Sequence, residues 1–277
     1  MSKSARNVLH ILGEKKSLTR VARKLAGIRY VRPVATTLLR CAFLLRILAS
    51  PSQRRHARRW LRSLTSGYLL ETATPWLVFD AIDYLEHHLR THIRVFEYGS
   101  GGSTLFWLRY GASCVSVEHE AHWYALLRPQ LAAEPSAEYR FVAPEPVATE
   151  CLPLDPADPA QYASADLALR DYSFRAYASQ IDEFADRSFD VILIDGRARA
   201  SCIMHAARKV ADGGMLILDN ANRSYYTAQA GDFLRGFSRM QFSGVGPCGT
   251  EMSRTDIYVR DSDSVSGSSR VARGLDG

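Results

Sequence analysis

Residues 95–103 have the sequence Val-Phe-Glu-Tyr-Gly-Ser-Gly-Gly-Ser, which predicts a strand followed by a glycine-rich loop and a helix. The apolar run over 94–98 predicts a buried strand, and a helix is expected over 104–110 because Ser103 can cap it. In an open α/β sheet, ligands bind beyond the carboxyl ends of the strands, where glycines let backbone amides approach them. The first candidate binding element is therefore the loop of Gly99, Ser100, Gly101, Gly102 and Ser103.

Strand-like and helix-like runs alternate along the chain on both sides of this loop. A helix is expected from Thr74, as N-cap before Pro75, to Arg90. After the loop, the pattern predicts strands over 114–117, 139–142, 189–194 and 215–218, and helices over 123–131, 173–185 and 200–210. Two strand-like runs, 241–245 and 255–259, have no helix between them. The chain is therefore expected to form a doubly wound, mostly parallel α/β sheet of seven strands with an antiparallel C-terminal hairpin.

Two acidic residues indicate which ligand the loop binds. Glu118 follows Glu97 by 21 residues and ends the next strand, where a carboxylate can accept both hydroxyls of a ribose. Thr104 stands where the dinucleotide fingerprint requires glycine or alanine. Glu97 would repel a pyrophosphate but suits a sulfonium cation. These features favour S-adenosylmethionine, and an NAD(P)-dependent oxidoreductase is the alternative.

Four motifs together resemble the class I S-adenosylmethionine-dependent methyltransferases, which have a Rossmann-like fold. The motifs are residues 95–103, 115–119, 189–196 and 213–220, and the resemblance extends over about residues 74–260. It implies that Glu97 and the glycine loop hold the methionine part of the cofactor, and that Glu118 holds the ribose. It also implies an adenine contact at Glu145 and a further cofactor contact at Asp195.

Acidic residues also follow two later strands, at Asp195 and at Asp219-Asn220. They are expected at the same edge of the sheet, and their oxygens are the ligands that Mg²⁺ prefers. The arrangement resembles the metal-dependent catechol and caffeoyl-CoA O-methyltransferases, although Ala198 replaces their lysine. That resemblance implies O-methylation of a small-molecule or carbohydrate-like acceptor, with Asp195 and Asp219 assisting catalysis. In the alternative interpretation, Asp195 caps a helix and Asp219 contacts only the cofactor or substrate.

The charge is distributed unevenly along the chain. Residues 1–63 contain 16 Lys/Arg and one acidic residue, whereas the remainder contains 19 Lys/Arg and 28 Asp/Glu. We interpret residues 1–63 as a basic, helical N-terminal extension. Three interpretations stay open: helices packed on the body, an organelle transit peptide, and an amphipathic helix on an anionic membrane. Nucleic acid is not expected as a partner, because no aromatic-interleaved RNA-binding motif is present.

The remaining features concern domains and location. A methyltransferase domain is expected over 64–260, followed by a Ser-, Gly- and Asp-rich tail over 261–277 that we expect to be disordered. Residues 143–172 contain five prolines and are expected to form either a lid over the pocket or a mobile loop. Five scattered cysteines without a CxxC pair indicate a reducing, cytoplasmic location, with the basic extension available for peripheral membrane attachment. A non-catalytic nucleoside-binding protein docked in this way is a third hypothesis.

Overall fold

The computed structural model describes residues 32–262, so the N-terminal 31 residues and most of the predicted disordered tail lie outside the described residues. The chain divides into two compact units. Among the described residues, one contains residues 32–61 together with Cys248–Glu251, and the other contains Arg62–Pro247 and residues 252–262.

The first unit is helical, as predicted for the extension. It contains α2 (Arg32–Ala49), the 3₁₀ helix η1 (Arg54–His56) and most of α3 (Ala57–Ser63). Phe43 and Trp60 are buried and pack edge to face, with ring centroids 5.5 Å apart. The Trp60 indole donates a hydrogen bond of 2.8 Å to the Gly249 carbonyl. None of the described helices is both long and apolar enough to cross a membrane.

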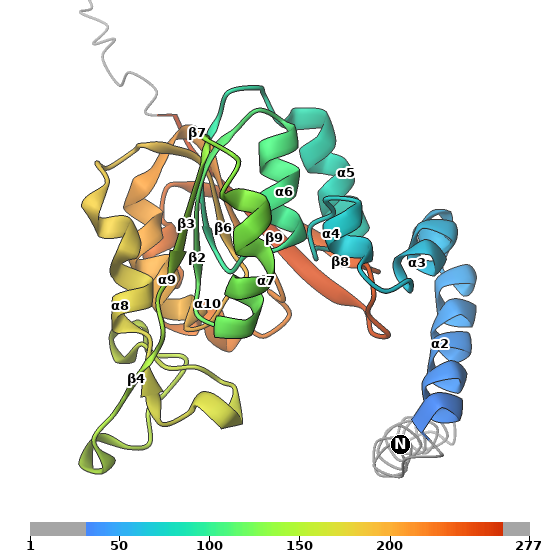
Figure 1. The fold of residues 1–277 in the computed structure, drawn as a ribbon, viewed down its shortest axis with the longest axis horizontal. Coiled ribbons are helices and arrows are strands. Elements are labelled where there is room, and N and C mark those ends of the chain that lie inside the picture. The colour runs from blue at the N-terminus through green and yellow to red at the C-terminus, as the bar shows by residue number, and fades with distance from the viewer. Residues whose placement is uncertain (1–31, 263–277) are drawn as a thin grey trace, which may run out of the picture. The chain divides into compact units, whose positions relative to one another are not determined.

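The second unit is built around a seven-stranded sheet with the order β3-β2-β1-β6-β7-β9-β8 (Figure 1). The first five of these strands are parallel, whereas β9 runs antiparallel to both β7 and β8. The strands are β1 (Arg94–Tyr98), β2 (Ser113–Glu118), β3 (Ala137–Phe141), β6 (Phe189–Ile194), β7 (Val210–Leu218), β8 (Phe237–Gly244) and β9 (Ser253–Arg260). The predicted fold class is therefore confirmed.

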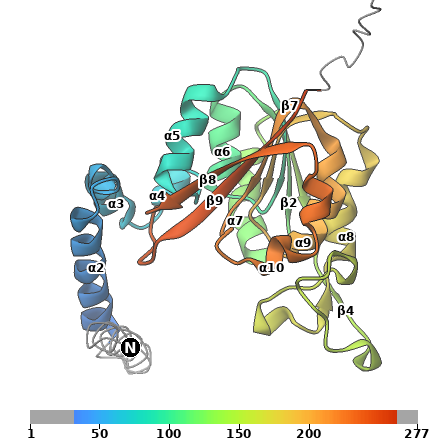
Figure 2. The ribbon, with the colours of Figure 1, turned by 180° about the vertical axis from the view of Figure 1, so that it is seen from behind.

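Helices cover both faces of the sheet, as Figures 1 and 2 show. One face carries α5 (Phe79–His88), α6 (Gly102–Arg109) and α7 (Ala121–Leu131). The other carries α8 (Arg175–Ala178), α9 (Arg199–Ala206) and α10 (Tyr225–Ala228). Because both faces are covered, every residue of 191–194 in β6 is buried, which explains the continuous apolar run in the sequence. The shorter elements are α4 (Tyr68–Glu71), η5 (Ser179–Glu183), η6 (Ala207–Lys209) and η7 (Gly231–Leu234).

Two predicted helices differ most from the structure, and a third, predicted over 200–210, ends as α9 at Ala206 and is followed by η6 and β7. The first begins at Phe79 and not after Thr74, because the backbone before it bonds to the C-terminal hairpin instead of forming a helical turn. The Phe79 amide donates to the Val245 carbonyl at 2.9 Å, and the Val78 amide donates to the Thr255 hydroxyl at 3.3 Å. The helix predicted over 173–185 is replaced by β5, α8 and η5 in succession.

The segment over 143–172 is folded. Its first strand, β4 (Glu145–Pro146), pairs antiparallel with β5 (Tyr172–Ser173). Between them lie three 3₁₀ helices, η2 (Thr149–Cys151), η3 (Pro159–Gln161) and η4 (Leu167–Leu169). This small sheet lies beside the carboxyl edge of the large sheet (Figure 1).

Candidate active site

The glycine loop joins β1 to α6 at the carboxyl edge of the sheet. Gly99 has a φ of 93° and Gly101 a φ of 150°, a backbone conformation that side chains strongly disfavour. A Cβ on Gly102 would lie 2.1 Å from the Thr74 carbonyl oxygen, so the backbone of the preceding segment packs directly on the loop. The conformation of the loop therefore depends on glycine at these positions and on the close packing of the segment that contains Thr74.

Glu97 lies beneath the loop and is completely buried. Its carboxylate accepts hydrogen bonds from the Thr104 hydroxyl, from the Ser116 hydroxyl at 2.6 Å and from the Trp107 indole at 3.1 Å. Burial raises the pKa of Glu97 to about 7, although these donors oppose the shift. Thr104 also accepts from the Gly101 amide at 3.1 Å. Glu97 thus supports the loop from below through Thr104.

The high pKa of Glu97 predicts a pH-dependent stability. A carboxyl whose pKa is raised in the folded state costs stability as pH rises from the unfolded value, near 4.5, to about 7. Glu97→Gln removes this cost, which amounts to about 3 kcal/mol across that range. We therefore expect urea unfolding to show wild type losing stability relative to Glu97→Gln between pH 5 and 7. Glu134→Gln, at an exposed position, is the control. If the free energy of unfolding changed with pH equally in wild type and Glu97→Gln, the raised pKa of Glu97 would be contradicted.

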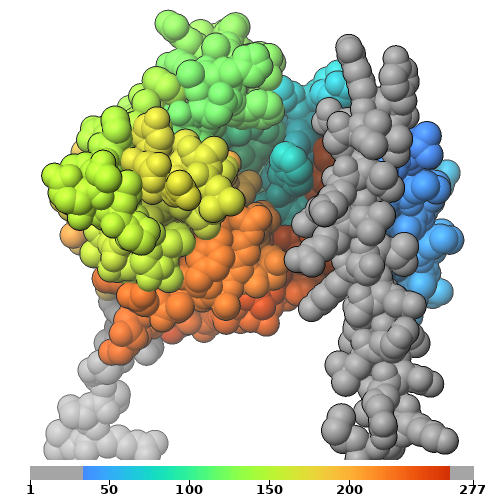
Figure 3. Space-filling view, turned by 90° about the horizontal axis from the view of Figure 1, so that it is seen from below, coloured from blue at the N-terminus to red at the C-terminus, as the bar shows by residue number. Residues whose placement is uncertain are grey.

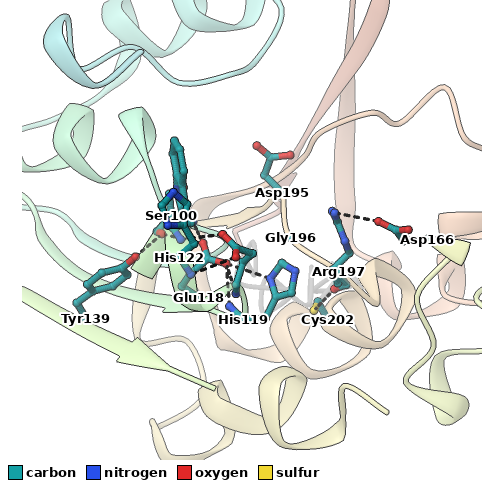
Figure 4. Close-up of polar contacts among 12 residues, drawn as sticks. Ser100, Glu118, His119, His122, Tyr139, Asp166, Asp195, Gly196, Arg197 and Cys202 are labelled. Carbon is teal, nitrogen blue, oxygen red and sulfur yellow. Dashed lines mark hydrogen bonds and ion pairs between the residues drawn. The ribbon is translucent and has the colours of Figure 1, made fainter. Parts of the chain in front are cut away.

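Glu118 faces the loop from the end of β2 (Figure 4). Its carboxylate accepts from the Ser100 amide at 3.2 Å and the Ser100 hydroxyl at 2.8 Å. It also accepts from the amides of His119 and Glu120, at 2.8 and 2.9 Å. Burial raises the pKa of Glu118, but hydrogen bonds from His119 and Glu120 outweigh it and bring the pKa below its ordinary value. The Glu118 side chain is therefore an ionised carboxylate that accepts hydrogen bonds from the loop and from the start of the next segment.

Two aromatic side chains that the sequence analysis did not single out hold Ser100 in place. The Tyr139 hydroxyl lies 2.7 Å from the Ser100 hydroxyl, and the Trp123 indole donates to the Ser100 carbonyl at 2.7 Å. Glu145, by contrast, lies exposed in the two-stranded sheet of β4 and β5. The structure thus brings Glu118 and Ser100 together and leaves Glu145 outside this hydrogen-bond network.

At the ends of β6 and β7, a buried arginine lies between the two predicted acids. Arg199 donates to the Asp195 carboxylate at 2.9 Å, to the Gly196 carbonyl at 3.1 Å and to the Asp219 carbonyl. Its guanidinium carbon also lies 5.2 Å from the ring centroid of Tyr226. Burial raises the pKa of both Asp195 and Asp219, and the Arg199 guanidinium opposes the rise. Arg199 is therefore the cation that links these two strand ends.

The predicted magnesium ligands do not fit a metal ion. Asp219 accepts from the Thr255 hydroxyl at 2.8 Å and from the Asn220 side-chain amide at 2.5 Å, so both of its oxygens have donors. Asn220 directs its nitrogen, which cannot ligate a metal, towards Asp219. Asp195 pairs with Arg199. The magnesium prediction is not supported, because a guanidinium already compensates the carboxylate charge.

A pocket of about 400 Å³ opens beside these strand ends. One wall comes from the folded segment, through Pro156 and residues 163–166, and the other from residues 196–199, Asn220, Arg223 and the two tyrosines of α10. Figure 3, viewed from the carboxyl edge, shows the surface of this segment next to the orange surface around α10. The segment therefore lines the pocket, as expected of a lid. Tyr225 and Tyr226 form part of its wall.

Gly196 connects the pocket to the glycine loop. It lines the pocket, and a Cβ built on it would lie 3.2 Å from the Gly99 amide nitrogen. The same Cβ would lie 2.0 Å from the hydroxyl of Tyr177, which is buried and has no hydrogen-bond partner among residues 32–262. A ligand on the loop and a ligand in the pocket would therefore meet at Gly196.

Comparisons with known proteins give matches among solved structures at low sequence identity. No protein-family model matches the sequence, and no curated protein matches it. The structure is similar to a methyltransferase from Pyrococcus furiosus, at 12% identity over 66% of this chain and 82% of that chain, with a TM-score of 0.38. It is similar to the precorrin-6y C5,15-methyltransferase from Geobacter metallireducens, at 13% identity over 66% and 87%, with a TM-score of 0.38. It is also similar to a methyltransferase-like protein from Silicibacter pomeroyi, at 22% identity over 64% and 84%, with a TM-score of 0.38.

Proposed function

We propose that this protein is an S-adenosylmethionine-dependent methyltransferase that methylates an oxygen of a small-molecule or carbohydrate-like acceptor. The observation that carries the proposal is the Glu118 carboxylate facing the Ser100 amide and hydroxyl across the glycine loop. A carboxylate there suits the two ribose hydroxyls of a nucleoside. The loop amides suit the carboxylate of the cofactor's methionine part. The adjoining pocket offers room for an acceptor next to the loop.

In this proposal the residues have distinct tasks. The residues of the loop, Gly99–Ser103, bind the methionine part, and Glu97 supports the loop from beneath because its own oxygens are already bonded. When bound, the cofactor would supply a methyl group on a sulfonium for transfer to the acceptor oxygen, leaving S-adenosylhomocysteine as the product. Asp195, whose side chain is 27% exposed, accepts the proton of that hydroxyl. Asp219 is buried and acts by fixing Arg199 and the strand end. Most of the rate enhancement would come from positioning the two reactants.

Calorimetric titration of the full chain with S-adenosylhomocysteine tests the cofactor assignment. Wild type is expected to bind, and Glu118→Ala is expected to lose about 1–3 kcal/mol of binding free energy, because charged hydrogen bonds are lost. Glu120→Gln is the control, since Glu120 caps α7 through the amides of His122 and Trp123. Magnesium is expected to leave the affinity unchanged. Binding of NADH in place of S-adenosylhomocysteine would instead support the oxidoreductase alternative, and binding without turnover the non-catalytic one.

We further propose that this cytoplasmic enzyme attaches peripherally to an anionic membrane through residues 1–63. Four large apolar side chains along α2 are at least half exposed: Val34, Leu38, Leu45 and Leu48. Their spacing places them on one face of the helix, and Arg40 and Arg46 lie on its flanks. A second copy of the chain would bring equal positive charge to this face, whereas anionic lipid has complementary charge.

The full chain should therefore co-sediment with vesicles containing anionic lipid at low salt. Leu38→Glu combined with Leu45→Glu is expected to reduce the bound fraction by about tenfold, because apolar burial and charge attraction are both weakened. Leu126→Glu, an exposed position on α7, is the control. Equal binding to neutral and anionic vesicles, or equal binding by the double variant, would contradict the proposal.

A further inference from the structure

The pocket beside the glycine loop has an excess of positive charge. Arginines reach it from the ends of two strands: Arg197 and Arg199 after β6, and Arg223 after β7. Asp166, in the folded segment, is the carboxylate among the lining residues. Arg199 is committed to Asp195 and to three backbone carbonyls. The charge that remains for a ligand therefore belongs to Arg197 and Arg223.

Arg197 uses little of its hydrogen-bonding capacity within the protein. A guanidinium has five N–H donors. One terminal nitrogen of Arg197 lies 3.3 Å from the Asp166 carboxylate, in a pair that is about 40% exposed on both sides (Figure 4). Its Nε is buried and has no hydrogen-bond partner among residues 32–262. The terminal nitrogens of Arg197, and not the buried Nε, are therefore the donors that a ligand in the pocket can reach.

Arg223 lines the same pocket from the loop after the neighbouring strand, β7. One of its terminal nitrogens donates to the Tyr226 hydroxyl at 2.9 Å, an interaction that positions the guanidinium over α10. Ser164, across the pocket, is 5% exposed, and its hydroxyl oxygen accepts from the Asp166 amide at 3.1 Å. Its proton is therefore available to a ligand. The pocket thus combines two guanidiniums with a hydroxyl donor.

We infer that this pocket binds an oxyanion group, such as a carboxylate or phosphate, between Arg197 and Arg223. Guanidinium groups bind such anions through paired hydrogen bonds, and the Asp166 carboxylate holds Arg197 in place until the ligand displaces it. Resting on the proposed function, the inference names the substrate class: the methyl acceptor is anionic, and this group orients its hydroxyl towards the loop at Gly196.

Inorganic phosphate is the probe for this site. Phosphate is titrated into the full chain at constant ionic strength against chloride, and binding is followed by calorimetry and by the unfolding temperature. Wild type is expected to bind phosphate more tightly than chloride. Arg197→Gln combined with Arg223→Gln should weaken phosphate binding by at least about tenfold, the effect of losing charged hydrogen bonds. Arg235→Gln is the control, because Arg235 is 81% exposed and pairs with Asp232.

Asp166→Asn provides a gain-of-affinity test. Removing the competing carboxylate should tighten phosphate binding, whereas an arginine that serves only the Asp166 ion pair would gain nothing for phosphate. Phosphate binding that is equal in wild type and the double arginine variant would overturn the inference, as would an absence of phosphate binding. S-adenosylhomocysteine affinity, measured on the same samples, separates the two proposals. Arginine-dependent phosphate binding without S-adenosylhomocysteine binding would support the anion site and overturn the proposed function.

Discussion

Arg199→Gln is expected to lower the free energy of unfolding by about 3–5 kcal/mol, the effect of removing one partner from a buried ion pair. Arg199 is 4% exposed and bonds to the Asp195 carboxylate and three backbone carbonyls. Glutamine cannot reach these acceptors together and carries no charge. The Asp195 and Asp219 carboxylates would then lie close together without a cation.

The loss should also depend on pH. Without Arg199, the pKa values of Asp195 and Asp219 rise further above the unfolded value of 3.8. Because the pKa of Asp195 is already about 8 with Arg199 present, the extra cost of removing Arg199 appears as pH rises above 8, so the variant should lose more at pH 9.5 than at pH 7. Urea unfolding at both pH values measures this. Arg208→Gln is the matched control, because Arg208 is 57% exposed and its ion pairs are worth at most about 1 kcal/mol. If Arg199→Gln and Arg208→Gln lowered the free energy of unfolding equally, the buried ion pair of Arg199 would not stabilise the fold as described.

Gly102→Ala is expected to destabilise the fold by about 3 kcal/mol or more, at the upper end of overpacking effects. The new methyl group would lie 2.1 Å from the Thr74 carbonyl oxygen and 2.6 Å from the Leu69 carbonyl oxygen. Both atoms belong to the backbone, so no side-chain rotation relieves the contact. The loop or the segment before α5 must move.

The control for this substitution is Gly231→Ala. A Cβ at Gly231 meets no atom within 4 Å, so its stability should stay within about 0.5 kcal/mol of wild type. Thermal unfolding of the two variants side by side makes the comparison. A Gly102→Ala protein as stable as wild type would show that the preceding segment does not pack on the loop as described.

The central strands could be predicted from the sequence because burial on both faces requires a continuous run of apolar residues. The ranges 94–98 and 189–194 coincide with β1 and β6, since both faces of the sheet are covered and all positions except Arg94 and Asp190 are buried. The start of α5 could not be predicted, because Thr74-Pro75 has the local pattern of a cap while the actual start depends on hydrogen bonds to a hairpin about 170 residues later in the chain.

The site shows the same division between local and distant information. The glycine loop and Glu118 were identifiable from their spacing. The hydrogen bonds that the buried Glu97 accepts come from hydroxyls on two other elements, which the local sequence does not reveal. In the structure, Ser116 lies directly opposite Glu97 in the pairing of β1 and β2, a register that the sequence pattern alone does not give. The role of Arg199 likewise had no local signal, because an arginine after a strand does not reveal which carboxylate it meets. The sequence therefore suggested a metal ion where the structure has a guanidinium.

The position of β9 between β7 and β8 has a consequence for biosynthesis. Asp219 is held by Thr255, and the Ala221 amide donates to the Arg254 carbonyl at 2.7 Å, so the end of β7 is completed by a strand made more than 30 residues later. A nascent chain that has left the ribosome only as far as β7 carries the glycine loop, Glu118 and Arg199 but lacks the partner of Asp219. The residues that follow β7, of which Asn220 and Arg223 line the pocket, therefore reach their final contacts only when the last strand enters the sheet.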